Sequence, residues 1–284
     1  MSNPRLIAQQ FPENPERLAL IAEFESIQRL AVAARAENDF HTVLERCDRA
    51  VPLARTALAR VLIESLGSLV STYLGDYQGA LERSIRAADH FDGSVPIHTQ
   101  ARAAAALHRS LGNALMGLGD PQRALAEYQA GANACDVAAD AWEHSAALYN
   151  LGEATAGLGD PERALHYFQQ ALEAKGRIGD DWGLSYTHAA LANLHATVDE
   201  PELALEEARR ALTLAPTSDL KLQSTVHRTM GEALLALGHE TEARDHLQVA
   251  VEAASQVGAA PELEAARSAL LRVGPGQRAS GSSS

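Results

Sequence analysis

The chain has 284 residues, of which 46% are hydrophobic and only 5% aromatic, and its formal net charge at pH 7 is −13. The acidic balance argues against nucleic-acid binding through a generic basic surface. No apolar run approaches the roughly 20 residues that a membrane helix needs, and two cysteines, Cys47 and Cys135, make no disulfide framework.

Residues 1–17 form a lead-in without the basic region and apolar core of a secretory leader. A reducing compartment also suits the two isolated cysteines. We therefore expect a cytoplasmic protein. From Arg17 to Glu37 the pattern predicts one long helix, which continues into the first of a series of repeated units.

One segment returns along the chain at a nearly constant step. Residues 111–128 reappear at 151–168, at 191–208 and at 230–247. Two fainter copies precede them, at 36–50 and 73–88, and the second of these fits with a one-residue irregularity. A fixed period of roughly 20–50 residues is typical of a stacked-repeat solenoid.

Each unit has the pattern of helix, tight turn, helix. A residue that tolerates positive φ ends the first helix, and an aspartate that can cap the next helix often follows it, twice with proline behind it. These features predict turns at Asn38-Asp39, Gly75-Asp76, Gly119-Asp120, Gly159-Asp160, Asp199-Glu200 and Gly238-His239.

Small residues recur where paired helices should approach most closely. A Leu-Gly step, as at Leu151-Gly152, lies in the first helix. In the second helix Ala164, Phe168 and Ala171 follow at spacings of four and three, which places them on one helical stripe. We predict an all-α, right-handed superhelical solenoid of about six helix-turn-helix repeats.

The array should end in a capping helix, because a terminal repeat would otherwise leave its apolar side in water. Residues 261–273 are amphipathic and suit this role, and Gly274-Pro275-Gly276 stops them. The predicted organisation is a lead-in at 1–17, a repeat array at 18–256, a capping helix at 257–273 and a disordered tail at 274–284.

This set of motifs resembles the tetratricopeptide repeat family over roughly residues 20–256. The segment from Ala147 through Leu151-Gly152 to Ala171 matches the family pattern best. A step near 40 is similar to the extended-helix subclass, which includes kinesin light chains and the sensing ends of bacterial transcription activators. The sequence departs from the pattern in the first helix, where His108, Leu148, His188 and His227 replace an aromatic residue.

No catalytic or metal-binding constellation is visible, so we expect no enzyme, no cofactor and no metal. His188 and His195 are separated by about 10 Å along a helix, which is too far for one ion. His108, His188 and His227 recur at one repeat position, and we interpret them as packed, hydrogen-bonded core residues. Gly117-Leu118-Gly119 lacks the preceding strand of a dinucleotide fingerprint.

The resemblance implies a concave groove lined by the first helices, in which a protein or peptide partner lies. Amide side chains match the alternating donors and acceptors of a peptide backbone, tyrosines add amphipathic contact area, and arginines either grip a carboxylate or pair with neighbouring glutamates. The predicted partner-binding residues are Arg109, Asn113, Tyr149, Glu153, Tyr186, Asn193, Arg228 and Glu232.

Several functions stay open at this stage. The leading interpretation is a non-enzymatic scaffold or adaptor that binds a protein or peptide and contacts neither nucleic acid nor membrane. The alternative is a peptide- or ligand-sensing regulatory protein whose superhelix changes curvature on binding, and the repeat ends could also form a homo-oligomer. A clamp for a partner's C-terminal carboxylate is disfavoured. Arg109, Asn113 and Asn150 match its first two helices, but Tyr186 and Ala190 replace its last two cations.

Overall fold

The computed structural model describes residues 40–54, 56–91, 97–135 and 141–273, and every regular element in these ranges is a helix. The predicted all-α repeat solenoid is confirmed. The chain divides into two compact units, Met1–Asp180 and Asp181–Ser284. The predicted lead-in, the first helix of the first hairpin with its turn at Asn38-Asp39, and the predicted tail lie outside the described residues.

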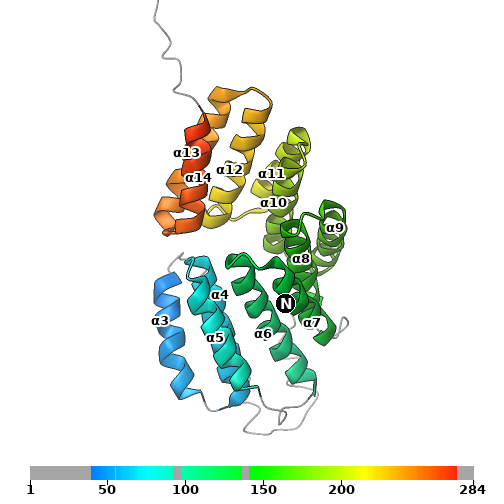
Figure 1. Cartoon of the computed structure of the whole chain (residues 1–284), viewed down its shortest axis with the longest axis vertical. Helices are drawn as coiled ribbons and strands as arrows, with labels where there is room; N and C mark the ends of the chain where they lie inside the picture. Colours follow the sequence, from blue (N-terminus) through cyan, green and yellow to red (C-terminus); the bar gives the residue numbers. More distant parts are fainter. Residues whose placement is uncertain (1–39, 55, 92–96, 136–140, 274–284) are drawn as a thin grey trace, which may run out of the picture. The chain divides into compact units, whose positions relative to one another are not determined.

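Within each unit, consecutive helices pair as antiparallel hairpins that pack side by side (Figure 1). Unit 1 contains α3 (Phe40–Ala50), the short 3-10 helix η1 (Val51–Leu53), α4 (Ala57–Tyr73), α5 (Tyr77–Asp89), α6 (Ile97–Gly117), α7 (Pro121–Ala134), α8 (Ala141–Gly157) and α9 (Pro161–Ile178). Unit 2 contains α10 (Asp181–Thr197), α11 (Pro201–Leu214), α12 (Leu220–Ala236), α13 (Glu240–Val257) and α14 (Ala260–Arg272).

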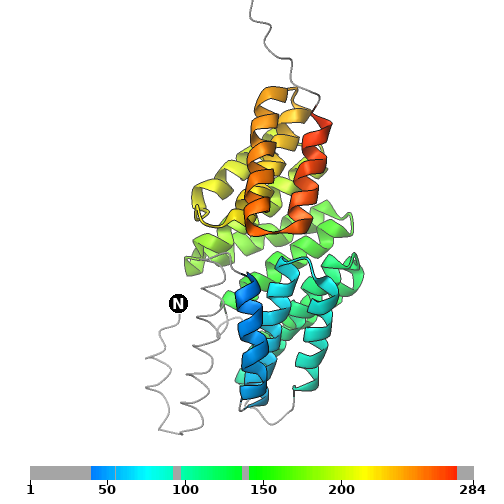
Figure 2. The ribbon, with the colours of Figure 1, turned by 90° about the vertical axis from the view of Figure 1, so that its left-hand side faces the viewer.

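The last helix, α14, packs against both helices of the final hairpin. Figure 2 shows α14 beside α12 and α13 in unit 2. Leu247, Ala269 and Val273 form a buried apolar cluster at this contact. This contact removes apolar surface of the hairpin from water.

The predicted turns between paired helices are confirmed wherever the structure describes them. Gly75, Gly119, Gly159 and Gly238 have φ between 75° and 81°, and Asp199 takes the same left-handed region with φ of 63°. After these turns Asp76, Asp120 and Asp160 each accept a hydrogen bond from a backbone N–H three residues on. Glu200 and His239 begin their helices without a side-chain cap.

The two helices of a hairpin approach most closely where the first helix carries glycine. A Cβ added to Gly152 would lie 2.5 Å from Cε1 of Phe168, which is fully buried. The same close approach joins Gly112 to Tyr128, and Gly231 to Leu247. All three pairs have the same spacing in sequence. The glycine therefore makes room for a large side chain of the second helix.

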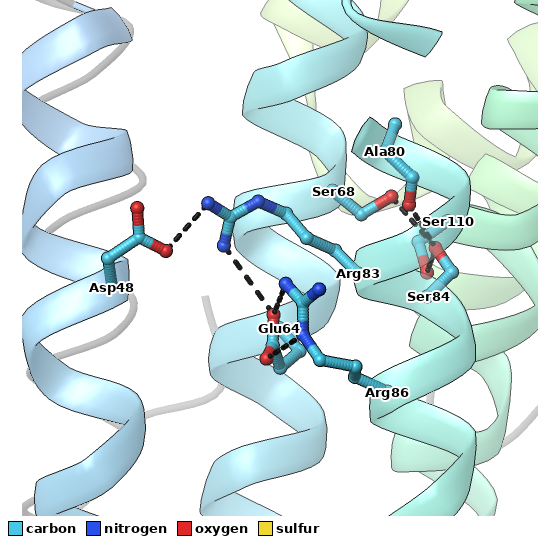
Figure 3. A network of polar contacts seen from close by, with 8 residues as sticks. All are labelled: Asp48, Glu64, Ser68, Ala80, Arg83, Ser84, Arg86 and Ser110. Carbon is cyan, nitrogen blue, oxygen red and sulfur yellow. Dashed lines mark hydrogen bonds and ion pairs between the residues drawn. The ribbon is translucent and has the colours of Figure 1, made fainter. Parts of the chain in front are cut away.

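The hairpin of α4 and α5 explains the one-residue irregularity of the second repeat. Counted from its turn, Ser68 and Ser84 occupy the places of the glycine and the large residue, and their hydroxyl oxygens lie 2.8 Å apart. Ser84 also donates to the hydroxyl of Ser110 on α6 at 3.1 Å (Figure 3). Buried hydroxyl contacts here replace the packing of glycine against a large side chain.

A second repeated contact joins the helices one turn further from the loop. Three pairs with the same spacing in sequence meet across their hairpins: His108 with Glu127 at 2.8 Å, His188 with Glu207 at 2.6 Å, and His227 with His246 at 2.8 Å. The expected hydrogen bonds of these histidines are confirmed, but the expected core position is wrong, because all three are only partly buried and the side chain of His108 is 31% exposed.

The α4–α5 hairpin places an ion pair at this same position. Glu64 Oε2 lies 3.5 Å from Nη1 of Arg83, and Arg86 Nε donates to Glu64 at 2.9 Å (Figure 3). Arg83 also reaches Asp48 on α3 at 2.6 Å. One repeat position thus carries a Glu–Arg pair in this hairpin, a His–Glu pair in two others and a His–His pair in the last one.

None of the described helices is long and apolar enough to cross a membrane. This agrees with the absence of a long apolar run in the sequence.

Overpacking the closest helix approach should destabilise the protein. Gly152→Leu places side-chain atoms where the Phe168 ring lies, and we expect a loss of about 1–3 kcal/mol or more in the free energy of unfolding. Glu173→Ala removes a side chain that is 72% exposed, and should cost less than about 0.5 kcal/mol. Chemical denaturation followed by circular dichroism measures both, and equal midpoints would contradict this packing.

The His227–His246 pair should make the last hairpin sensitive to acid. Burial and the neighbouring His246 lower the pKa of His227, and burial lowers that of His246 despite the nearby Asp245 and Glu242, with Arg209 of α11 acting in the same direction as burial. The unfolded chain therefore binds more protons than the folded chain, and stability should fall as the pH drops through about 6.5.

His246→Glu is the matched variant for this prediction, because it recreates the pair that His188 forms with Glu207. Although burial opposes it, the hydrogen bond and charge of His188 lower the pKa of Glu207. In the variant, protonation of His227 should be favourable, so the loss of stability between about pH 7.5 and pH 5.5 should shrink. Denaturation midpoints of both proteins at both pH values test this. If the midpoint of the variant falls between the two pH values as much as that of wild type does, the prediction is wrong.

Candidate functional site

The eight predicted partner-binding residues fall on the first helices of four hairpins, with equal shares in the two units. They are Arg109 and Asn113 on α6, Tyr149 and Glu153 on α8, Tyr186 and Asn193 on α10, and Arg228 and Glu232 on α12. The helices α6 and α8 pack against each other in unit 1, and α10 and α12 do so in unit 2. Within each unit the predicted residues therefore lie on neighbouring helices.

Arg109 does not pair with Glu153, one of the options that the sequence left open. Its Nε lies 3.6 Å from Glu143 on α8, and its guanidinium carbon lies 5.4 Å from the centre of the Trp142 ring. Glu143 is 6% exposed, so this carboxylate is held in the interior. Nε of Arg109 is buried and has no hydrogen-bond partner.

Arg109 and Asn150 help to line a small hollow between α6, α7 and α8. Asn150 is 7% exposed, and its Nδ2 has no hydrogen-bond partner. Two donors, Nε of Arg109 and Nδ2 of Asn150, therefore share one hollow, and neither has an acceptor within hydrogen-bond distance. The walls comprise Ala105 and Arg109 from α6, Tyr128 and Gly131 from α7, and Glu143, Ala147 and Asn150 from α8.

Asn150 was left out of the predicted groove set. The one sequence feature that points to Asn150 is its match to an asparagine of the carboxylate clamp. That clamp is disfavoured because Tyr186 and Ala190 replace its last two cations. What the sequence could not show is that no described side chain accepts a hydrogen bond from Nδ2 of this amide. A buried donor without a partner costs about 1–3 kcal/mol, so its presence calls for an explanation.

Asn113 is already engaged through its acceptor. The Tyr128 hydroxyl donates to Oδ1 of Asn113 at 2.8 Å, which leaves the amide NH₂ as the group that a ligand would meet. The groove prediction did not include Tyr128, because its place in the repeat pattern marks it as a packing residue, and it is buried as that place predicts. Burial raises the pKa of this phenol, and the nearby Glu153 carboxylate adds to the rise.

Tyr149 lies between an aromatic and a cationic neighbour. Its ring centre is 5.9 Å from that of Phe168, and Nζ of Lys175 is 5.6 Å from it. Burial raises the pKa of Tyr149 well above its usual value, and Glu153 contributes to the shift. Tyr149 therefore keeps its proton and presents a neutral hydroxyl and an apolar ring.

Glu153 follows Tyr149 by one helical turn. Burial alone raises the pKa of its carboxyl to about 7. Among the described residues, no hydrogen bond or ion pair reaches this carboxylate. Its electrostatic neighbours are the phenols of Tyr128 and Tyr149.

Tyr186 has a structural role in unit 2. Its hydroxyl donates to Oδ1 of Asp219 at 3.3 Å, and its ring lies 4.5 Å from that of Trp182. Trp182 Nε1 donates to the other carboxylate oxygen of Asp219 at 2.8 Å, and Asp219 caps α12 by accepting from the backbone N–H of Leu222. The three side chains thus join the start of α10 to the start of α12.

Arg228 and Glu232 pair with each other at 2.5 Å, the second option that the sequence left open for Arg228. Arg272 from α14 binds the other oxygen of Glu232. Asn193, in contrast, is exposed on α10. In unit 2 three of the four predicted residues are thus engaged in internal contacts.

The described residues contain no group of three or more histidine, cysteine or acidic side chains that could hold a metal ion. The described side chains of unit 1 include a buried amide donor without a hydrogen-bond partner at Asn150, a carboxylate without an ion pair at Glu153, and aromatic rings on adjacent helices.

Comparison with known proteins yields one family and a set of solved structures. A family model described as tetratricopeptide repeat matches residues 102–177 and 143–217. No curated protein sequence matches the chain.

Three solved structures illustrate the likeness of fold. NprR in complex with its cognate peptide NprX has a TM-score of 0.63 and 14% identity, over 89% of this chain and 71% of that one. BtubC (BKLC) from P. vanneervenii has a TM-score of 0.52 and 18% identity, over 90% and 96% of the two chains. The apo form of RapI has a TM-score of 0.53 and 12% identity, over 89% and 96%. At these identities the likeness concerns the fold alone.

Proposed function

We propose that this chain, which is a tetratricopeptide repeat protein, is a non-enzymatic scaffold that holds an extended segment of a protein partner against the first helices of unit 1. The observation that carries the proposal is Asn150 Nδ2, a buried donor without a hydrogen-bond partner, at one hollow with Arg109, whose Nε lies 3.6 Å from Glu143 and forms no hydrogen bond. A peptide carbonyl is the acceptor that such donors bind most readily.

The surrounding side chains support an extended peptide as the ligand. The amide NH₂ of Asn113, the ring of Tyr149 and the carboxylate of Glu153 follow on the same two helices. Such a surface alternates polar and apolar groups, as a peptide does. NprR, which has a similar fold, was solved in complex with a peptide.

The opposing properties of unit 2 indicate where binding concentrates. The polar groups of three predicted residues there already have partners within the unit. Tyr186 donates a hydrogen bond to Asp219, Arg228 pairs with Glu232, and Arg272 also pairs with Glu232. A partner would have to break these contacts before gaining its own. We therefore assign the main contacts to Arg109, Asn113, Tyr149, Asn150 and Glu153.

Asn150→Leu tests the proposal, because leucine has a similar branched shape and lacks the unpaired amide. We expect partner binding to be lost, while the free energy of unfolding is unchanged or rises by up to about 1–2 kcal/mol. Partners captured from lysate are identified by mass spectrometry and then titrated, purified, against wild type and variant. Glu173→Ala, on the exposed face of α9, is the control.

A purified partner that binds Asn150→Leu as tightly as wild type would contradict the proposed site. A clear loss of folded-state stability in Asn150→Leu would also count against it, because it would show that the amide already has a stabilising partner.

A further inference from the structure

The first helices of four hairpins have one equivalent position, which is occupied by Asn113, Glu153, Asn193 and Glu232. Each of these residues lies the same number of positions before the start of the second helix. The two carboxylates at this position have different surroundings. Glu232 pairs with two arginines, whereas Glu153 forms no ion pair with a described residue.

Glu232 is fully engaged by cations. Arg228, one turn earlier on α12, contacts one carboxylate oxygen at 2.5 Å, and Arg272 of α14 contacts the other. The side chain of Glu232 is 24% exposed, so both guanidinium groups bind it from a partly solvated groove. Two cations at one carboxylate are the arrangement that offsets its desolvation.

Glu153 has neither partner. Tyr149 takes the place that Arg228 has in the other hairpin, one turn earlier on the same helix. Arg109, the cation on the preceding first helix, is turned to Glu143 and Trp142. Lys175 of α9 lies over the Tyr149 ring and 3.9 Å from Asp180. No cation of the described residues forms an ion pair with Glu153.

The immediate neighbours of Glu153 suit a bound cation. The rings of Tyr128 and Tyr149 are close enough for the Glu153 carboxylate to act on both phenols. Aromatic rings attract guanidinium and ammonium groups, as Lys175 Nζ at 5.6 Å from the centre of the Tyr149 ring illustrates, and the nearby Glu153 carboxylate supplies the opposite charge. The site therefore combines an unpaired acid with two neutral aromatic groups.

We propose that Glu153 receives a guanidinium or primary ammonium group of the bound segment, in the place that Arg228 and Arg272 take at Glu232. The inference rests on the proposed function and adds to it the chemistry of the partner: a segment with an arginine, a lysine or a free amino terminus. The partner's cation then does for Glu153 what the protein's own arginines do for Glu232.

Selection from a library of random short peptides displayed on phage tests the inference without knowledge of the natural partner. Wild type should enrich peptides that carry arginine or lysine at a fixed place. Synthetic copies of these peptides should bind Glu153→Gln about tenfold or more weakly, because a charge-assisted contact is lost. Glu232→Gln is the matched control, and should bind the same peptides as wild type does.

The dependence of peptide affinity on pH gives a second readout. The Glu153 carboxyl has a pKa of about 7 and ionises above it, so wild-type affinity for a cationic peptide should rise between about pH 6 and pH 8. The facing groups on α6, α7, α8 and α9 are Arg109, Tyr128, Tyr149 and Lys175, and both phenols stay protonated in this range. In Glu153→Gln the rise should disappear.

The outcomes separate the two proposals. Enriched peptides without a common cation, or peptides that bind wild type and Glu153→Gln alike, would overturn the inference and leave the scaffold function intact. If wild type enriches no peptide that the Asn150→Leu variant does not enrich equally, the proposed peptide site is wrong, and the inference is wrong with it.

Discussion

The fold depends on one contact, the close approach of two helices where the first has little or no side chain. Gly112, Gly152 and Gly231 leave room for Tyr128, Phe168 and Leu247, and any Cβ at the glycine would meet the opposing side chain at 2.3–2.5 Å. Because interiors are packed nearly as densely as crystals, this contact fixes how the two helices slide and rotate against each other. Once it is fixed, every other position of the hairpin has a defined neighbour.

That constraint lets the chemistry vary while the geometry stays. The position that pairs across the hairpin holds Glu64 with Arg83, His108 with Glu127, His188 with Glu207 and His227 with His246. These are three kinds of pair, Glu–Arg, His–Glu and His–His, yet each brings two polar side chains together at the same distance from the turn. The side chains that face away from the hairpin contact vary in the same way, which gives each repeat its own surface.

The sequence predicts the part of this structure that repetition encodes. Turn residues such as Gly159 and Asp199, caps such as Asp160, and the Gly152–Phe168 spacing each follow from local rules that one repeat confirms for the next. The contacts of the site residues differ from repeat to repeat, so the repeat pattern could not predict them. Arg109 pairs with Glu143 and not with Glu153, and Tyr186 donates a hydrogen bond to Asp219. Both contacts depend on side chains from other helices. Asn150 differs from its repeat equivalents, and only the structure shows that its Nδ2 has no hydrogen-bond partner among the described residues.

The contrast between the two units bears on why unit 1 would keep its unsatisfied groups. A buried donor without an acceptor costs about 1–3 kcal/mol, and an apolar residue of similar shape at position 150 would avoid that cost. Unit 2 shows that the same scaffold can satisfy such groups internally, since Glu232 is held by two arginines. Under the proposed function, the groups without partners at Asn150 and Glu153 are those to which the bound segment supplies the missing contact. In unit 1 the donors at Asn150 and Arg109 and the acid at Glu153 lie on adjacent first helices, so one extended segment could satisfy all three. Their combination, two donors and one acid, also describes that segment: backbone carbonyls followed by a cation.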